Sequence, residues 1–245
     1  MKTTVLLALA LLATVAHADQ PLVGDRPDFT ESARAVPTGS VQVEAGVTLD
    51  TSDAADLTTV GEILVRYGLK PGTELRFNVP SYLSLKPDGG DKLTGAGNLA
   101  FGFKQQLGHG DAGPRLAVLT HLTLPTGDED VTASDTAVDL VLAAEWDLAD
   151  NLGLGMNVGG ELVFDQDTSA RQWLSASVGL SATDRLGLFA ESFVFTEELD
   201  TFASYLDFGA TYLLTDTFQV DARVGLGLGD HEDELFYGAG LVTRF

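Results

Sequence analysis

From residue 40 to the C-terminus, apolar and polar side chains alternate along almost the whole chain. Near the start of this region, Val41, Val43 and Val47 fall on one face of an extended chain, and Glu44 and Thr48 fall on the other. A period of two indicates β-strands whose two faces meet different surroundings. Twelve segments follow the pattern: residues 40–50, 57–69, 73–85, 94–107, 114–125, 136–148, 152–165, 171–182, 185–196, 202–214, 217–228 and 235–245.

The length of these segments favours a membrane barrel over a globular fold. Each holds about eleven to fourteen residues, whereas strands of globular proteins cluster near five or six and a tilted membrane strand needs roughly nine to eleven. Beyond residue 18 the chain has no run of eighteen apolar residues, which excludes a helical membrane protein. We predict an all-β fold, a transmembrane up-and-down antiparallel β-barrel of about 12 strands. A soluble β-sandwich also alternates, so periodicity alone leaves it open.

The first eighteen residues have the features of an export signal. Lys2 supplies a positive start, Val5 to Val15 form an apolar stretch too short to span a bilayer, and Ala16-His17-Ala18 matches the pattern that signal peptidase cleaves. The lack of cysteine fits export without a disulfide framework. We expect a signal peptide at residues 1–18, a periplasmic N-terminal lead-in at 19–39 and an outer-membrane β-barrel at 40–245.

Acidic residues gather in alternate connections between the predicted strands. Half of the 36 acidic residues lie in connections 50–56, 86–93, 126–135, 165–170, 196–201 and 229–234. The intervening connections are short turns, which outer-membrane barrels place in the periplasm. A net charge of −22 repels nucleic acid. We therefore expect a monomer in the cell outer membrane that contacts lipid, lipopolysaccharide and a small-molecule solute, with no nucleic-acid partner.

The polar faces of the strands predict a charged lumen. Closing the sheet with its apolar faces toward lipid removes these charges from the hydrocarbon, and the terminal Phe245 resembles an outer-membrane insertion signal. The candidate lumen-lining residues of the solute pathway are Glu44, Arg66, Arg76, Lys104, Arg115, His121, Asp139, Glu145, Glu161, Glu191, Asp207 and Arg223.

Neighbouring positions on these faces predict ion pairs and a transverse field. We expect Glu44 to pair with Arg66 and Asp207 with Arg223, and strand closure to bring Arg244 near Glu44. Basic residues of the early strands would face acids of the later ones, an arrangement that orients a polar or anionic solute. A salt-bridged interior that only stabilises the wall is the alternative.

Three classes of function remain open. A channel for passive passage of small solutes is the first, a closed structural barrel that interacts with lipopolysaccharide is the second, and a lipid-modifying enzyme is the third. His121 is the candidate base for an enzyme, but no Gly-x-Ser-x-Gly elbow accompanies it. The acidic clusters 128–130 and 230–234 lack the ligand spacing of a calcium loop. We expect no enzyme, no cofactor and no metal site.

The residues before the first predicted strand carry a family resemblance. Residues 25–32 (Asp-Arg-Pro-Asp-Phe-Thr-Glu-Ser), 36–39 (Val-Pro-Thr-Gly), 66–69 (Arg-Tyr-Gly-Leu), 124–127 (Leu-Pro-Thr-Gly) and 184–191 (Asp-Arg-Leu-Gly-Leu-Phe-Ala-Glu) resemble the family labelled "putative MetA-pathway of phenol degradation". The resemblance covers essentially the whole mature chain. It implies an outer-membrane barrel and, loosely, uptake of aromatic compounds.

The same opening residues suggest a gate. We hypothesise that Asp25, Arg26, Asp28 and Glu31 tuck into the periplasmic mouth and narrow or gate the lumen. The alternative is a simple surface lead-in.

Overall fold

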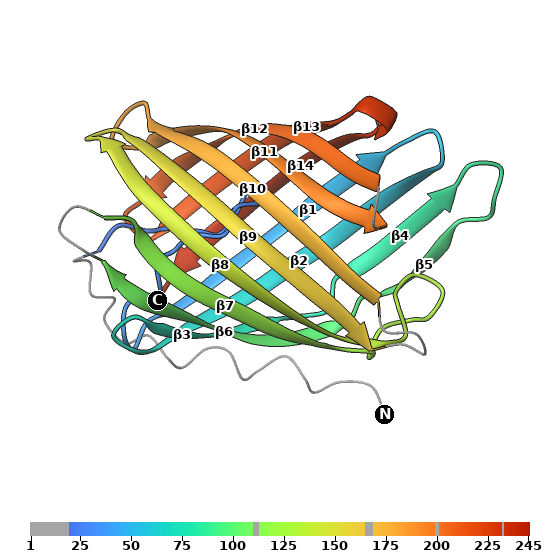
Figure 1. Ribbon diagram of the computed structural model, residues 1–245, viewed down its shortest axis with the longest axis horizontal. Helices are drawn as coiled ribbons and strands as arrows, with labels where there is room; N and C mark the ends of the chain where they lie inside the picture. The colour runs from blue at the N-terminus through green and yellow to red at the C-terminus, as the bar shows by residue number, and fades with distance from the viewer. Residues whose placement is uncertain (1–19, 110–112, 165–168, 199–200, 232) are drawn as a thin grey trace.

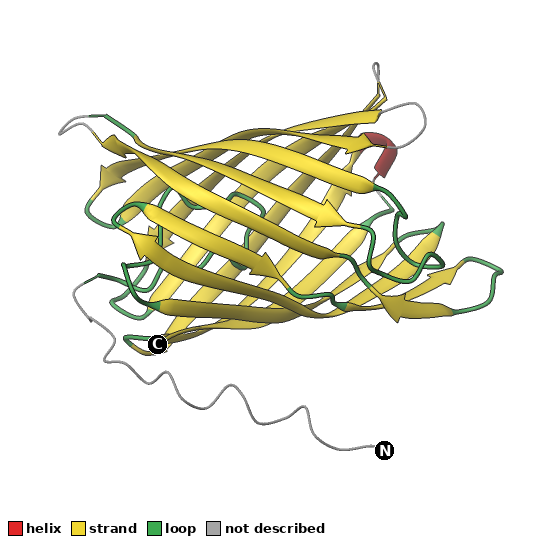
Figure 2. Ribbon diagram, turned by 90° about the horizontal axis from the view of Figure 1, so that it is seen from below, coloured by secondary structure: helices red, strands yellow, loops and turns green. Residues whose placement is uncertain are grey.

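The computed structural model describes residues 20–109, 113–164, 169–198, 201–231 and 233–245. The predicted signal peptide lies outside the described residues. The strands are β1 (Val41–Thr51), β2 (Ala55–Lys70), β3 (Thr73–Asn78), β4 (Tyr82–Pro87), β5 (Leu93–Ala96), β6 (Leu99–His109), β7 (Arg115–Leu124), β8 (Thr136–Ala149), β9 (Leu152–Phe164), β10 (Ser169–Ser181), β11 (Leu186–Glu198), β12 (Thr201–Thr215), β13 (Phe218–Leu228) and β14 (Leu235–Arg244). A short 3-10 helix, Gly229–His231, follows β13 (Figure 2).

The strands close into a barrel. Each wall strand pairs antiparallel with its neighbours, and β1 pairs with both β2 and β14 (Figure 1). Twelve strands form the closed wall, and the short strands β4 and β5 extend it at one end. The predicted all-β barrel of about 12 strands is confirmed.

Two predicted strands are interrupted, which the alternation did not reveal. Segment 73–85 divides into β3 and β4, which pair with the second and first halves of β2. The break falls at residues 79–81, where Pro80 has no N–H to donate to the ladder. Opposite this break β2 bulges, and Glu62 adopts a φ of 41°. Segment 94–107 divides in the same way: β5 ends before residues 97–98, and β6 begins after them.

The two faces of the wall are distributed as in a membrane barrel. Outward side chains such as Leu140 and Val158 are 59% and 54% exposed, whereas Arg66 and Lys104, pointing inward, are 1% and 0% exposed. A soluble sandwich would hide its apolar faces and show the charged ones to water, so the structure excludes that alternative. No helix in the described ranges is long and apolar enough to cross a membrane.

The two ends of the barrel differ. At one end the turns are tight, as at Pro71-Gly72 between β2 and β3, where Gly72 takes a φ of 74°. Phe245 lies at this end, where its backbone pairs with that of Val41. Because outer-membrane barrels turn tightly on the periplasmic side, we call this the periplasmic end and the other the extracellular end.

Candidate functional site

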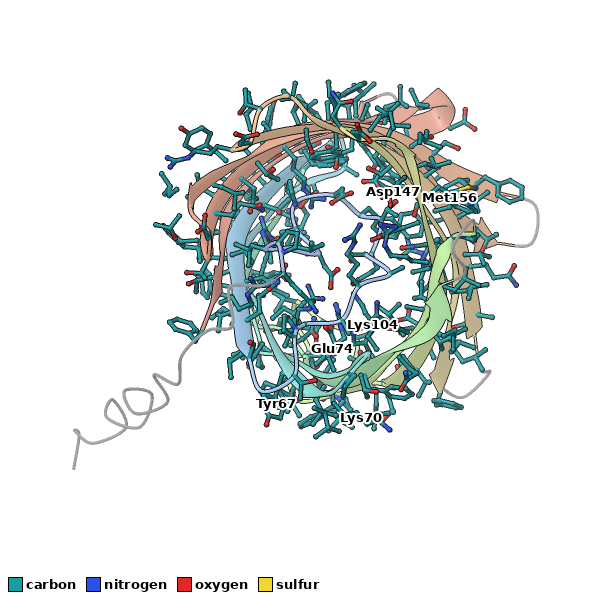
Figure 3. The ribbon with its side chains drawn as sticks, turned by 90° about the vertical axis from the view of Figure 1, so that its left-hand side faces the viewer. Tyr67, Lys70, Glu74, Lys104, Asp147 and Met156 are labelled. Atoms are coloured by element: carbon teal, nitrogen blue, oxygen red, sulfur yellow. The ribbon has the colours of Figure 1, made fainter. Side chains whose placement is uncertain are left out.

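Residues 20–40, which we call the N-terminal segment, run inside the ring of strands (Figure 3). The segment has no strand or helix of its own, so its backbone N–H groups need other partners. Side chains of the wall supply them. Glu44 accepts from the N–H groups of Asp25 and Arg26 at 3.0 Å, and Glu191 accepts from those of Phe29 and Thr30 at 2.6 and 2.7 Å.

The same arrangement continues along the segment. Asn157 Oδ1 accepts from the N–H of Glu31 at 2.6 Å, Glu145 from that of Ala33 at 2.9 Å, and Glu74 from that of Val36 at 2.7 Å. Four acidic side chains of the lumen and one amide, that of Asn157, thus hold a piece of irregular backbone, and they do so from strands far apart in the sequence.

A charged cluster joins the segment to the wall near β2, β3 and β6. The Asp25 carboxylate lies 3.1 Å from Arg66 Nη1, 2.5 Å from Arg76 Nη1 and 3.0 Å from Lys104 Nζ. Figure 3 shows Glu74 and Lys104 inside the ring of strands, with Tyr67 outside it. We call the full set the central ion cluster; its members are Asp25, Glu31, Glu44, Arg66, Glu74, Arg76 and Lys104.

The cluster sets the ionisation of the segment's acids. Burial by itself would raise the pKa of Asp25, but Arg66, Lys104 and Arg76 outweigh burial and hold that pKa well below its usual range. Burial raises the pKa of Asp28 well above its usual range, and the neighbouring Glu191 adds to the effect. Asp25 therefore stays ionised, whereas hydrogen bonds, including one to Ser177, only partly offset the burial of Asp28.

Arg26 occupies a slot formed by glycines. A Cβ at Gly46 of β1 would lie 2.3 Å from the Arg26 guanidinium, and one at Gly240 of β14 would lie 2.4 Å from Arg26 Nε. In this slot Arg26 reaches Glu62 Oε2 at 2.5 Å and Asp221 Oδ1 at 3.5 Å. Only a position without a side chain leaves room for the guanidinium here.

Phe29 points into an aromatic cluster on the far side of the lumen. Its ring stacks on Phe193 at 4.7 Å, meets Phe195 edge-on at 5.1 Å and approaches Trp173 at 6.4 Å. Tyr205 stacks on Phe193 at 5.0 Å and Phe236 lies 6.2 Å from Phe193. We call Phe29, Trp173, Phe193, Phe195, Tyr205 and Phe236 the aromatic cluster.

Two cavities lie at opposite ends of the barrel. The periplasmic cavity, about 630 Å³, is bordered by the β8–β9 and β10–β11 turns, and Asp28 and Thr30 line it. The extracellular cavity, about 400 Å³, is bordered by residues of the β1–β2 and β13–β14 connections, and Phe29 lines it. Residues 28–30 therefore border both cavities, with Asp28 and Thr30 on the periplasmic one and Phe29 on the extracellular one.

The predicted lumen residues fall into distinct groups. Arg66, Arg76 and Lys104 are buried under the segment and line neither cavity. Glu145 lines the periplasmic cavity and Arg223 the extracellular one. Glu44 and Glu191 bind the segment. Three others have partners on the wall: His121 contacts Asp139, Arg115 pairs with Asp147, and Asp207 lies beside Arg223. Glu161, on β9, is partly exposed.

Of the expected ion pairs, two form and one does not. Glu44 lies 2.9 Å from Arg66, and Asp207 lies 3.6 Å from Arg223. The expected approach of Arg244 to Glu44 is wrong, because Arg244 instead donates to the carbonyl oxygens of Gln20 and Pro21. The prediction of a transverse field is also wrong. Acids of the segment and of the same early strands neutralise the basic side chains inside the central ion cluster.

Sequence reasoning missed the aromatic cluster and the Arg26 slot. The signal for the first was present, because Phe193 and Tyr205 share strand parity with Glu191 and Asp207 and so belong to the polar face. Aromatic side chains on a lumen face indicate an apolar patch within a wet interior. Nothing in the sequence indicated the slot, since it forms only where β1 and β14 meet.

Comparison with known proteins gives a family match. The sequence profile of the family described as "Putative MetA-pathway of phenol degradation" matches residues 24–245. A search of curated proteins found no match.

Solved structures with the same architecture include outer-membrane channels and porins. An outer membrane channel from Pseudomonas putida F1 matches with 16% identity and a TM-score of 0.72, covering 86% of this chain and 97% of that one. The KdgM porin in complex with disordered oligogalacturonate matches with 9% identity and a TM-score of 0.59, covering 83% and 99%. The NanC porin matches with 12% identity and a TM-score of 0.57, covering 82% and 98%. At these identities the likeness concerns the fold alone.

Proposed function

The chain belongs to the family described as "Putative MetA-pathway of phenol degradation", and we propose that it is an outer-membrane channel through which small solutes pass down their gradient. The pair of cavities carries this proposal. A closed wall with a cavity at each end, both of them bordered by residues 28–30, is the arrangement expected of a narrow path across the barrel. Its location is the cell outer membrane, where it acts as a monomer among lipid and lipopolysaccharide.

The solutes are small and uncharged, and they include aromatic compounds. The KdgM porin was solved with an oligogalacturonate, a polyanion, which needs exposed cations. Here Arg66, Arg76 and Lys104 are at most 3% exposed and are paired with acids. The aromatic cluster beside the extracellular cavity suits a flat apolar ring instead.

Solute leakage from liposomes tests the channel. Vesicles that contain the mature protein should release small neutral solutes faster than empty vesicles, with a sharp size limit across a graded panel of sugars, aromatic acids and phenols. The alternative of a closed structural barrel predicts release at the rate of the empty lipid. That result would refute the channel.

The N-terminal segment acts as the gate, with Asp25, Arg26, Asp28 and Glu31 holding it in the lumen. The chain has no cysteine, so an engineered disulfide can test movement. Thr30 Oγ1 lies 2.8 Å from Ser175 Oγ on β10. A Thr30→Cys/Ser175→Cys protein should conduct less when oxidised than when reduced, whereas the parent protein should not respond to reductant. Equal single-channel conductance in both redox states would refute a moving gate.

We do not propose an enzyme, because the one histidine suited to act as a base is already engaged. His121 Nδ1 lies 3.1 Å from Asp139, and its Nε2 accepts a hydrogen bond from Arg76 Nε at 2.9 Å. A nucleophilic hydroxyl would need that Nε2 position. Turnover of an outer-membrane lipid that His121→Ala abolishes would contradict this.

A further inference from the structure

Both faces of one lumen ring are covered by other rings. Phe193 stacks with Phe29 at 4.7 Å and 26°, and with Tyr205 at 5.0 Å and 18°. Two rings stacked nearly parallel on the same ring must occupy its opposite faces. Phe193 is thus held between a ring from the wall and a ring from the N-terminal segment.

The two covering rings are held in different ways. Tyr205 belongs to β12, which pairs with β11 and β13 along its length. Phe29 belongs to the segment, where its backbone is in no strand ladder; the Phe29 and Thr30 N–H groups donate to Glu191, and the Thr30 hydroxyl contacts Ser175. The Phe29 ring can therefore leave Phe193 by side-chain rotation, while Tyr205 stays in place.

The extracellular cavity adjoins this stack. Phe29, Phe193, Phe195, Tyr205 and Phe236 all line its volume of about 400 Å³. A cavity of roughly 150 Å³ is enough to hold benzene, so a single aromatic ring enters with room to spare.

We propose that this cavity binds a small neutral phenol, whose ring replaces that of Phe29 on the face of Phe193. The proposal rests on the channel function and adds its binding site and ligand class. Phe29 is then an internal occupant of the solute site, and an arriving solute displaces a side chain of the segment that borders both cavities.

The polar lining favours a hydroxyl over a carboxylate. Arg223 lines the cavity with Asp50 and Glu234, and Asp207 lies 3.6 Å from Arg223. One cation among three carboxylates repels an anion. Within the described part of the chain, Arg223 Nε and both carboxylate oxygens of Asp207 are buried without hydrogen bonds. Asp207 itself lies outside the cavity lining, so a solute hydroxyl would meet Arg223 together with Asp50 or Glu234. A hydroxyl suits such a pair, because it accepts from a guanidinium and donates to a carboxylate.

The test is binding of 4-fluorophenol to the purified mature protein in detergent, followed by ¹⁹F NMR against empty micelles. 4-Fluorobenzoate and 4-fluorocyclohexanol serve as ligand controls for charge and aromaticity. Saturable binding of the phenol, with weaker binding of both controls, is the expected result. Equal binding of the three compounds, or binding no greater than that of empty micelles, would overturn the proposal.

Three variants locate the site. Phe193→Leu removes the stacking surface and should weaken phenol binding by about two- to tenfold, the range expected for one aromatic pair. Phe29→Ala removes the competing ring and should tighten binding by a similar factor. Phe103→Leu, on the lipid face at 41% exposure, is the matched control and should leave affinity unchanged. Unchanged affinity in Phe193→Leu and Phe29→Ala would place the phenol elsewhere and overturn the proposal.

Leakage and binding measurements together distinguish a channel without this site from a site without passage. If liposomes leak small sugars but the protein shows no phenol-specific binding, the protein is a channel that lacks this site. If the protein binds phenol specifically but no solute leaks, the binding site is supported and passage of solutes is refuted.

Discussion

Replacing Asp25 with asparagine should release the N-terminal segment from the lumen. The substitution preserves the shape of the side chain but removes the carboxylate that meets Arg66, Arg76 and Lys104. An amide oxygen can still accept the Ser32 N–H, which lies 3.1 Å from Asp25 Oδ1. The change therefore isolates the charge that links the segment to the wall.

The structure sets the size of the effect. Breaking a buried ion pair by removing one partner costs about 3–5 kcal/mol. The central ion cluster has four acids and three cations, so Asp25→Asn leaves three of each and no net charge. We therefore expect the lower end, about 3 kcal/mol, which shifts the ratio of seated to released segment by roughly a hundredfold.

The rate at which a cysteine at position 33 reacts with a maleimide reports whether the N-terminal segment is seated in the lumen. Ala33 is 0% exposed and packs against Ala117, Leu119 and Ala143, and no native cysteine competes for a maleimide. In an Ala33→Cys background, Asp25→Asn should label about a hundredfold faster than the parent, provided that reseating outpaces labelling. Asp91→Asn, in the exposed β4–β5 connection, is the isosteric control and should label like the parent.

Barrel integrity is checked separately, by the gel mobility of unheated samples. Equal labelling rates for Asp25→Asn and Asp91→Asn in folded barrels would refute the reasoning, because the buried charge would then contribute nothing to seating.

Three further predictions follow from the segment and the wall. The raised pKa of Asp28, caused by burial and then by Glu191, favours the seated segment at acidic pH and weakens seating as pH rises through that pKa. Single-channel conductance should therefore increase as the pH rises from the ordinary carboxyl range toward the raised pKa of Asp28, and Asp28→Asn should reduce that dependence. An identical pH profile of conductance in the variant would contradict this prediction. Gly46→Ala should displace Arg26 and speed labelling at position 33, since its Cβ would lie 2.3 Å from the guanidinium. Gly179→Ala, where nothing lies within 4 Å of the added Cβ, should not. Leu142→Arg, at a lipid-facing position that is 42% exposed, should destabilise the barrel in vesicles by about 2–4 kcal/mol in urea unfolding; no measurable change would argue against lipid contact there.

Part of the interior could be predicted from the wall alone. The Glu44–Arg66 and Asp207–Arg223 pairs were predictable because each joins strands that are neighbours in sequence and pair directly. The predicted approach of Arg244 to Glu44 was wrong because the partners of Arg244 are carbonyl oxygens of the N-terminal segment, which has no periodic pattern. The breaks at residues 79–81 and 97–98 were missed because alternation continues across them.

What the sequence determined by itself is the wall. A period of two assigns every residue of a long strand to one of two faces, and an apolar face eleven to fourteen residues long has few environments other than lipid. Local spacing alone fixes these two faces, whatever tertiary contacts the chain makes.

Only the tertiary structure decided what lies within the wall. The Phe29 N–H and the Glu191 carboxylate that accepts from it are 162 residues apart, and the Arg26 slot exists only where the last strand meets the first. Ring closure brings these groups together. Because a segment held by side chains and not by a strand ladder leaves no periodic mark, its path across the lumen could not be predicted from local pattern.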